Sequence, residues 1–279
     1  MSLHTDILNQ ISKDIVTAIN YKQPVIDTDD AMTGVMEFLS SAVPSIAITG
    51  NESIDALIDD YLAKLFMQVR VLSSKAFLHN PYIQNIHFHD QTHGHYQLRN
   101  MTYEKGELFF YDFPYQTDGI LIPRIGCFDK RVSFPSIYEG SMPWMSVIPS
   151  EIKTMSLPIQ KACGNVLTLG LGLGYYPYMA ALKDDVRSMT VVEKSADVID
   201  LFKYCILNQF SREVKDKFQI IHEDAFQYMD SVTDGMYDVI FTDIYEGYED
   251  GHQVYESMQK YQKTLVNTDI EYWIESYIH

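Results

Sequence analysis

The spacing of apolar residues changes twice along the chain and so marks out three regions. In residues 1–81, apolar side chains recur every three or four positions, as at Ile7 and Ile11 and again from 54 to 69. This is the spacing of an amphipathic helix. Ser53 precedes the second stretch and is a residue type that caps helices. The region predicts a helical N-terminal domain, and its sequence contains no pattern that indicates chemistry.

Residues 82–149 contain short runs typical of strands, such as ELFFYDF and GILIPRIG, separated by turn residues, which predicts a small β-rich segment. Gly106 lies between two of these runs. A hairpin is therefore expected there, with Tyr103 opposite Phe109 or Phe110. We expect the segment to precede the core of the protein as a small β domain.

Residues 150–279 alternate short apolar runs with helical patterns, which is typical of an α/β domain with a doubly wound, mostly parallel sheet. Ser150 is the expected cap of the helix that leads into this domain. The expected strands are 165–169, 188–193, 218–222 and 237–243, followed by one last element. Right-handed crossovers between them give the strand order 3-2-1-4-5.

The first of these strands runs into a glycine-rich turn. Gly170, Gly172 and Gly174 carry no Cβ atoms, so a ligand can lie directly on the peptide groups at the start of the next helix. Glu193 ends the second strand, where an acid accepts hydrogen bonds from both hydroxyls of an adenosine ribose. Tyr175 stands where a dinucleotide fold needs a third small residue. The turn and the acid therefore predict an adenosine-type ligand without a pyrophosphate.

Four sequence blocks resemble the class I (Rossmann-like) S-adenosylmethionine-dependent methyltransferases, and most of all their spermidine-synthase-like branch: VLTLGLGLG, VVEKSADVI, IIHEDAFQYM and YDVIFTDIYEG. They lie within residues 165–247. The resemblance implies a Rossmann-like sheet and S-adenosyl-L-methionine as the cofactor. The family's usual sheet has seven strands, and the residues after Asp243 are too few for the last two. The cofactor-binding residues that the resemblance implies are Gly170, Gly172, Gly174, Glu193, Lys194, Asp224 and Ala225.

The reacting centre is expected beside Asp243, which follows the fourth strand directly. We assign Asp243 the role of general base or substrate anchor, with Tyr245 as its catalytic neighbour. The acidic segment that follows suits an amine. Tyr96 and Gln97 match a Tyr-Gln pair of the spermidine-synthase branch. Trp144 could form an apolar wall over the cofactor or substrate, or it could pack in the core between the domains. The expected substrate-contacting residues are Tyr96, Gln97, Trp144 and Glu246.

These features predict a methyltransferase that acts on a small molecule, for which an amine is one candidate. The second hypothesis is an aminopropyltransferase that uses decarboxylated S-adenosylmethionine. In that family an aspartate holds the donor's amine, but Leu173 stands here, and YEGYED replaces its proline-rich gate. The third hypothesis is a non-catalytic cofactor-binding or scaffold protein that keeps the fold. The sequence leaves all three open.

The composition narrows the partners. The formal net charge is -17 over 279 residues without a basic patch, so we expect a small-molecule substrate and no nucleic acid. We find no apolar run long enough for a membrane, no charged-then-apolar leader, and three cysteines without metal spacing. These features predict a cytoplasmic protein with reduced thiols. A homodimer is one way to cover the sheet edge that the missing strands leave.

Four histidines, His87, His89, His93 and His95, form a candidate set of metal ligands. The first two would share a face of one strand, and a turn at Gly94 would have to bring the other two to them. Because class I methyl transfer needs no metal, we predict none. The alternative is a polar loop near the substrate or a plain surface segment.

Overall fold

The computed structural model describes residues 3–87 and 89–278 and divides into two compact units. Unit 1 spans residues 3–79, 102–133 and 148–150. Unit 2 spans the described residues of 80–101, 134–147 and 151–278. Among the described helices, none combines the length and apolar character that crossing a membrane requires.

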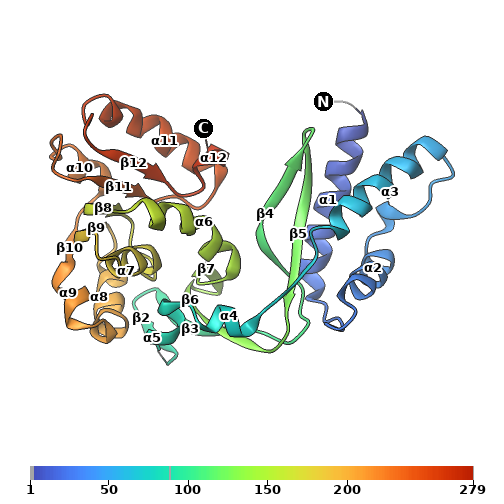
Figure 1. The fold of residues 1–279 in the computed structure, drawn as a ribbon, viewed down its shortest axis with the longest axis horizontal. Helices are drawn as coiled ribbons and strands as arrows, with labels where there is room; N and C mark the ends of the chain where they lie inside the picture. Colours follow the sequence, from blue (N-terminus) through green and yellow to red (C-terminus); the bar gives the residue numbers. More distant parts are fainter. Residues whose placement is uncertain (1–2, 88, 279) are drawn as a thin grey trace. The chain divides into compact units, whose positions relative to one another are not determined.

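Unit 1 packs helices on a three-stranded sheet of order β1-β5-β4 (Figure 1). Its elements are α1 (Leu3–Lys22), α2 (Ala31–Ala42), η1 (Pro44–Ile46), α3 (Glu52–Phe66), β1 (Arg70–Leu72), α4 (Ser74–Leu78), β4 (Phe109–Thr117) and β5 (Ile120–Phe128). Leu8, Ile11, Ile15 and Ile19 are buried along α1, which packs against β5. The predicted amphipathic face of this helix is confirmed.

Two helices of unit 1, α2 and α3, begin at an Asp or Asn side chain that caps them. The Asn51 side-chain oxygen accepts the N–H groups of Ser53 and Ile54 at 3.1 and 3.4 Å and so caps α3. The prediction that Ser53 is the cap is wrong, because the helix begins one residue before it. Asp30 caps α2, a short helix that the sequence analysis did not identify.

The strands between residues 82 and 149 are shared between the two units. β4 pairs with β5 around the turn at Gly119, whereas β3 (Tyr96–Tyr103) belongs to another sheet. The predicted hairpin at Gly106 is therefore wrong, although the rings of Tyr103 and Phe109 do stack with centroids 4.3 Å apart. Both runs do form strands, but the choice of partner strand depends on contacts distant in sequence.

Unit 2 contains the predicted α/β core and most of a four-stranded sheet of order β2-β3-β6-β7. The smaller sheet adds β2 (Gln91–His93), β6 (Val132–Glu139) and β7 (Met142–Ser146) to β3. The core strands are β8 (Gly164–Leu169), β9 (Val186–Glu193), β10 (Phe218–His222), β11 (Val239–Thr242) and β12 (Asp269–Tyr272). The helices are α5 (Pro81–Asn85), α6 (Pro149–Lys161), α7 (Tyr175–Ala181), α8 (Ala196–Cys205), η2 (Leu207–Gln209), α9 (Arg212–Lys217), α10 (Ala225–Met229), α11 (Tyr248–Gln262) and α12 (Glu275–Ile278).

The core sheet has the order β10-β9-β8-β11-β12 with parallel pairing throughout, which confirms the predicted order 3-2-1-4-5. Helices cover both of its faces, with α7 and α8 on one side and α11 on the other (Figure 1). Val166, Leu167 and Leu169 are fully buried in β8. Leu182, the residue that follows α7, is 39% exposed. α6 begins at Pro149, so Ser150 lies inside its first turn instead of capping it.

Candidate functional site

The carboxyl ends of the parallel strands bring four predicted site residues to one edge of the sheet. Gly170 follows β8, Glu193 ends β9, Asp224 lies two residues after β10, and Asp243 follows β11. Open parallel sheets bind ligands outside the carboxyl ends of their strands. This edge is therefore the candidate site.

The turn after β8 requires glycine for steric reasons. Gly170, Gly172 and Gly174 have positive φ angles of 98°, 48° and 70°. A Cβ on Gly170 would collide with the main-chain carbonyl oxygen of Asp243, so glycine lets the ends of β8 and β11 approach closely. The Gly174 N–H donates to the carbonyl oxygen of Leu171 at 2.7 Å and closes the turn.

Glu193 is buried, with an exposed fraction of 7%, and its carboxylate points at the turn. One carboxylate oxygen accepts the Leu171 N–H at 3.1 Å, and the other accepts the Ser195 N–H at 2.8 Å. Each oxygen has a second lone pair, so Glu193 can also accept hydrogen bonds from two ligand hydroxyls. The side chain joins the turn to the start of α8 and stands where the predicted ribose contact needs it.

A side chain from β7 lies over the turn. The thioether sulfur of Met145 accepts the N–H of Leu173 at 3.3 Å. It occupies the space that a Cβ on Gly172 would take. The turn and Glu193 fit the cofactor parts that the resemblance assigns to them, whereas Met145 fills the space above Gly172. No sequence pattern indicates this contact, because it joins residues far apart in the chain.

The predicted adenine contact begins a helix. Asp224 is exposed and caps α10, with one carboxylate oxygen accepting the N–H groups of Phe226 and Gln227 at 2.9 and 3.1 Å. The other carboxylate oxygen is the acceptor that an adenine amino group would use. Ala225 is buried behind it. Lys194 is exposed, so its side chain points away from the buried edge.

Asp243 has a second carboxyl group close to it, which the sequence analysis did not select. Burial, together with the negative charge of Glu151, raises the pKa of Asp243 to about 8. Burial raises the pKa of Glu151 to about 7. Both groups therefore hold a proton at a pH at which an exposed carboxyl group is fully ionised.

Two hydrogen bonds fix the first turns of α6 beside Asp243. The Trp273 ring N–H donates to the Thr154 hydroxyl at 3.0 Å, and the Trp273 main-chain N–H donates to the Thr242 carbonyl oxygen at 3.0 Å. Thr154 lies one helical turn after Glu151, and Thr242 directly precedes Asp243. The only sequence signal for a role of Glu151 at this site was its position in the first turn of a helix. Acids are common there because they interact favourably with the helix dipole, so the signal is not specific.

Tyr245 and Glu246 follow Asp243 but make contacts of their own. The Tyr245 hydroxyl donates to the Trp273 carbonyl oxygen, and its ring lies 5.8 Å from the Trp273 ring. Burial and the charge of Asp243 raise the pKa of Tyr245. Glu246 is exposed, and its N–H donates to the Asp250 carboxylate at 2.7 Å. Tyr245 thus stabilises the end of β12, and its hydroxyl is engaged with main chain instead of Asp243.

Two of the predicted substrate residues lie together. The rings of Tyr96 on β3 and Trp144 on β7 have centroids 5.3 Å apart, and both side chains are half-buried. The Gln97 side-chain oxygen accepts a hydrogen bond from Arg99. Trp144 directly precedes Met145, so the Trp144 ring of this pair lies on the strand that reaches the glycine turn.

A set of contacts that the sequence analysis missed ties α5 to the turn. The Tyr82 hydroxyl donates to the Leu173 carbonyl oxygen at 2.6 Å. The Asn80 side chain donates to the Tyr175 hydroxyl at 2.8 Å. Tyr175, whose size argued against a pyrophosphate, is therefore also an anchor for α5. A tyrosine in a short helix carries no sequence signal for such a role.

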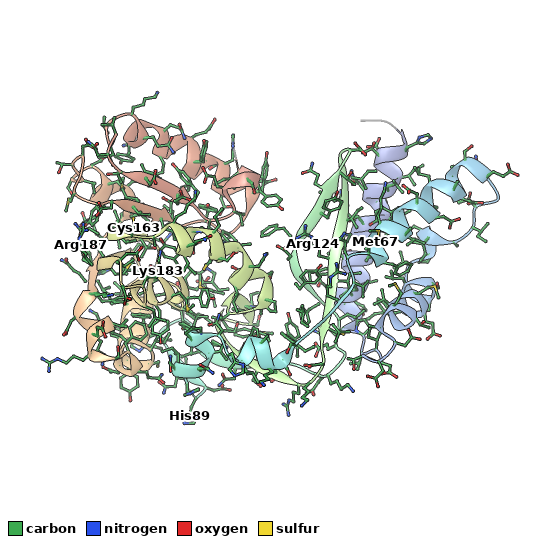
Figure 2. All side chains as sticks on the ribbon, viewed as in Figure 1. Met67, His89, Arg124, Cys163, Lys183 and Arg187 are labelled. Atoms are coloured by element: carbon green, nitrogen blue, oxygen red, sulfur yellow. The ribbon has the colours of Figure 1, made fainter. Side chains whose placement is uncertain are left out.

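The histidines of the predicted cluster are spread along the segment. His87 and His89 lie between α5 and β2, so the expectation that they share a face of a strand is wrong; both are exposed, as Figure 2 shows for His89. His93 lies on β2, with its ring nitrogen 3.9 Å from Asp197 and 3.8 Å from Asp200. Within residues 3–87 and 89–278, no group of three or more His, Cys, Asp or Glu side chains is arranged so that it could hold a metal ion.

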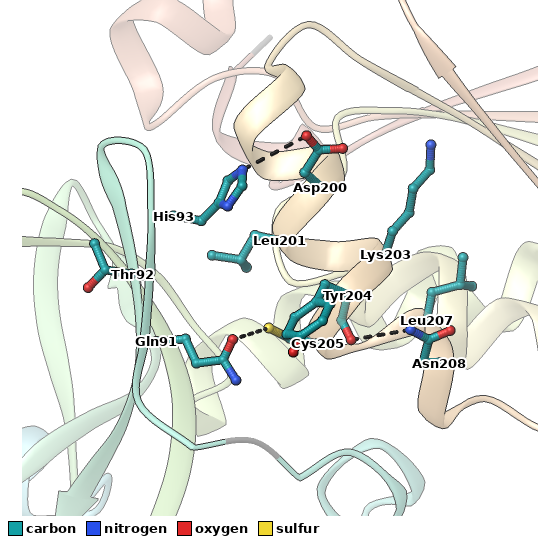
Figure 3. A pocket seen from close by; sticks show the side chains of 10 residues that line it. All are labelled: Gln91, Thr92, His93, Asp200, Leu201, Lys203, Tyr204, Cys205, Leu207 and Asn208. Carbon is teal, nitrogen blue, oxygen red and sulfur yellow. Dashed lines mark hydrogen bonds and ion pairs between the residues drawn. The ribbon is translucent and has the colours of Figure 1, made fainter.

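A surface hollow of about 800 Å³ lies between β2 and α8 (Figure 3). Its walls include His93, which faces Asp200, and Gln91, whose side-chain oxygen accepts the Cys205 thiol at 3.2 Å. None of the predicted cofactor or catalytic residues lines it. The hollow is therefore separate from the candidate site.

Comparisons with known proteins give partial structural similarity. No family model and no curated protein matches this sequence. A probable spermidine synthase from Corynebacterium glutamicum is 18% identical with a TM-score of 0.34, over 57% of this chain and 52% of that one. Spermidine synthase from Thermotoga maritima is 14% identical with a TM-score of 0.34, and the similarity covers 52% of this chain and 58% of that one. A putative O-methyltransferase from Klebsiella pneumoniae is 16% identical with a TM-score of 0.28, and the similarity covers 37% of this chain and 46% of that one. The chain thus spans about half the length of the solved structures to which it is similar.

Proposed function

We propose that this chain binds S-adenosylmethionine at the carboxyl edge of its parallel sheet and transfers the methyl group to a small acceptor. The observation that carries the proposal is the meeting of the glycine turn, the buried Glu193 carboxylate and Asp243 at one edge. Residues 170–174 and Glu193 would hold the methionine and ribose parts of the cofactor, and Asp224 with Ala225 the adenine. When bound, the cofactor supplies an electrophilic methyl group on a positively charged sulfur.

Asp243 is the group that we assign to the acceptor. A carboxylate whose conjugate acid has a pKa of about 8 is a much stronger base than an ordinary aspartate and is matched to neutral conditions. It would take the proton that the acceptor loses as the methyl group is transferred. An amine is the acceptor that suits this edge best, because a nearby ammonium group would favour ionisation of Asp243 and Glu151 and then pair with their charges.

The other two hypotheses differ in their support. The side chain of Leu173 is fully buried and offers no charge to the free amine of an aminopropyl donor, so that hypothesis gains nothing at the turn. The non-catalytic hypothesis is favoured by the side chain of Met145 over Gly172. Ligand binding separates a scaffold protein from our proposal, and methyl transfer separates a non-catalytic cofactor-binding protein from it.

Calorimetric titration with S-adenosylmethionine and S-adenosylhomocysteine tests the binding step. We expect the unmodified chain to bind both ligands. Glu193→Gln should bind at least roughly tenfold more weakly, because an amide cannot accept all the hydrogen bonds that the carboxylate accepts. Glu213→Gln, at an exposed position on α9, is the matched control and should bind unchanged. No binding at millimolar ligand would support the non-catalytic hypothesis.

Transfer is tested with methyl-labelled cofactor and a panel of small amines. Asp243→Asn should bind S-adenosylhomocysteine with nearly unchanged affinity, since the turn and Glu193 remain. Its transfer rate should fall by about 10²- to 10⁴-fold, which is the usual contribution of a general base. Full activity in this variant would remove Asp243 as the base and leave the binding proposal intact.

A further inference from the structure

Met145 makes a specific contact at the candidate cofactor site. Its sulfur lies 3.3 Å from the Leu173 nitrogen and accepts that N–H group. The same sulfur and the terminal methyl group fill the space above Gly172, the position where the backbone has no Cβ. The chain thus satisfies, with its own thioether, a donor that the glycine turn would otherwise present to a ligand.

The main chain around Met145 is firmly held. The Ser136 hydroxyl donates to the Met145 carbonyl oxygen at 2.9 Å and lies 2.5 Å from the Ser146 hydroxyl. Met145 pairs with Ile137 across the sheet, and the register shifts at the next position, so that β7 has an extra residue at Trp144. A β-bulge of this kind redirects neighbouring side chains. We infer that the bulge at Trp144 helps to direct the Met145 side chain toward the glycine turn.

The Met145 side chain is of a type that can change its packing and give up its hydrogen bond to a stronger acceptor. Methionine has three rotatable bonds and adapts to several packings at low cost. A thioether is also a weak hydrogen-bond acceptor, whereas a carboxylate or hydroxyl oxygen accepts the same N–H more strongly. A ligand with an oxygen acceptor can therefore replace the Met145 sulfur at Leu173 with a net gain in hydrogen bonding.

We propose that Met145 is a displaceable plug of the cofactor site. In the ligand-free chain it holds the Leu173 N–H and the space above Gly172, and the cofactor binds after this side chain rotates away. This inference rests on the proposed function, because it assumes that an S-adenosyl ligand lies on the turn. The plug lowers the apparent affinity by the fraction of molecules in which the turn is free.

The first experiment compares three chains by calorimetric titration with S-adenosylhomocysteine. Met145→Ala removes the plug and should bind roughly fivefold or more tightly than the unmodified chain. Met142→Ala is the matched control, because Met142 lies on the same strand and is 70% exposed; its affinity should not change. Equal or weaker binding by Met145→Ala, in a protein in which the ligand does bind, overturns the plug and leaves the proposed function standing. No binding by any of the three chains overturns both.

The second experiment uses the unmodified chain and so does not depend on how Met145→Ala folds. Methionine ε-methyl groups labelled with ¹³C are followed by NMR, with the Met145 signal assigned from its absence in Met145→Leu. Addition of S-adenosylhomocysteine should shift the Met145 signal and leave the Met142 signal in place. A Met145 signal that stays unmoved at saturating ligand overturns the proposal.

Discussion

The Asp243 and Glu151 carboxyl groups lie close enough for the charge of one to affect the other, and both residues are half-buried. Burial disfavours the charged form of each group, and a like charge nearby adds to the effect on Asp243. The two groups therefore titrate as a coupled pair near neutral pH. A pair of this kind links the pH dependence of folding to the pH dependence of any reaction at this edge.

Asp243→Asn should change how stability depends on pH. The pKa of Asp243 rises from 3.8 in the ordinary state to about 8 in the folded chain. Between about pH 4 and pH 8 the folded state holds a proton that the unfolded state has lost, so stability falls as pH rises, by at most about 1.4 kcal/mol per pH unit. Asparagine cannot titrate. The gain in the free energy of unfolding of the variant over the unmodified chain should therefore grow from pH 5 to pH 8 in urea denaturation. Exposed Asp184→Asn is the control, and parallel curves for all three chains would contradict the burial of Asp243.

Glu151→Gln should lower the pKa of Asp243. The variant removes a negative charge that opposes ionisation of Asp243 and keeps nearly the same shape. The direct measurement is the pH titration of the ¹³C carboxyl signal of Asp243 by NMR, whose midpoint should move to lower pH. Glu213→Gln should leave the midpoint in place. An unchanged midpoint in Glu151→Gln would mean that burial alone sets the pKa of Asp243.

Among the helices, strands and turns, the features that the sequence predicted correctly are those that depend on residues close together in the chain. The apolar runs of β8 to β11, the glycine turn and the helix with Val198, Ile199 and Phe202 inward are all local patterns, and each is present as expected. Parallel strands joined by helices also obey a handedness rule that leaves few orders. The strand order could therefore be derived without knowing any tertiary contact.

The remaining features depend on contacts between distant residues. The partner of β4 could not be chosen, because alternation is the same for a strand paired with β3 or with β5. The hydrogen bond between Met145 and Leu173 and the charge interaction between Glu151 and Asp243 join different elements of unit 2. The spacing of apolar and polar residues does not indicate such pairs. The sequence therefore predicted which edge of the sheet forms the candidate site, but not all the residues of that site.

Tyr82→Phe should loosen the contact between α5 and the glycine turn. Tyr82 is fully buried, and the variant leaves the Leu173 carbonyl oxygen without the hydroxyl that donates to it at 2.6 Å. A lost buried hydrogen bond of this kind costs about 1–3 kcal/mol. Urea denaturation should show a loss of this size, whereas Tyr204→Phe, at a position 72% exposed, should change stability little. Equal stability of both variants would contradict the anchoring role.

At the scale of the whole molecule, acidic residues outnumber basic ones by 38 to 21. Ion pairs such as Lys161–Glu271 at 2.7 Å and Arg187–Asp238 at 2.9 Å join side chains of which at least one is substantially exposed. Exposed pairs contribute about 0–1 kcal/mol each. The excess of negative charge, in contrast, repels itself over the whole folded surface. We therefore expect repulsion to outweigh attraction in the dependence of stability on salt.

Raising the NaCl concentration from about 20 mM to about 300 mM at pH 7 should stabilise the chain, because the screening length shortens to well below the size of the molecule. The expected rise in melting temperature is about 2–4 °C, which corresponds to about 1 kcal/mol for a chain of this size. KCl should act equally, because screening depends on ionic strength and not on the identity of a bound ion. Near the sequence pI of about 4.8 the net charge vanishes and the same salt step should have little effect. A melting temperature that falls with salt at pH 7 would show that the ion pairs contribute more to stability than the net repulsion removes.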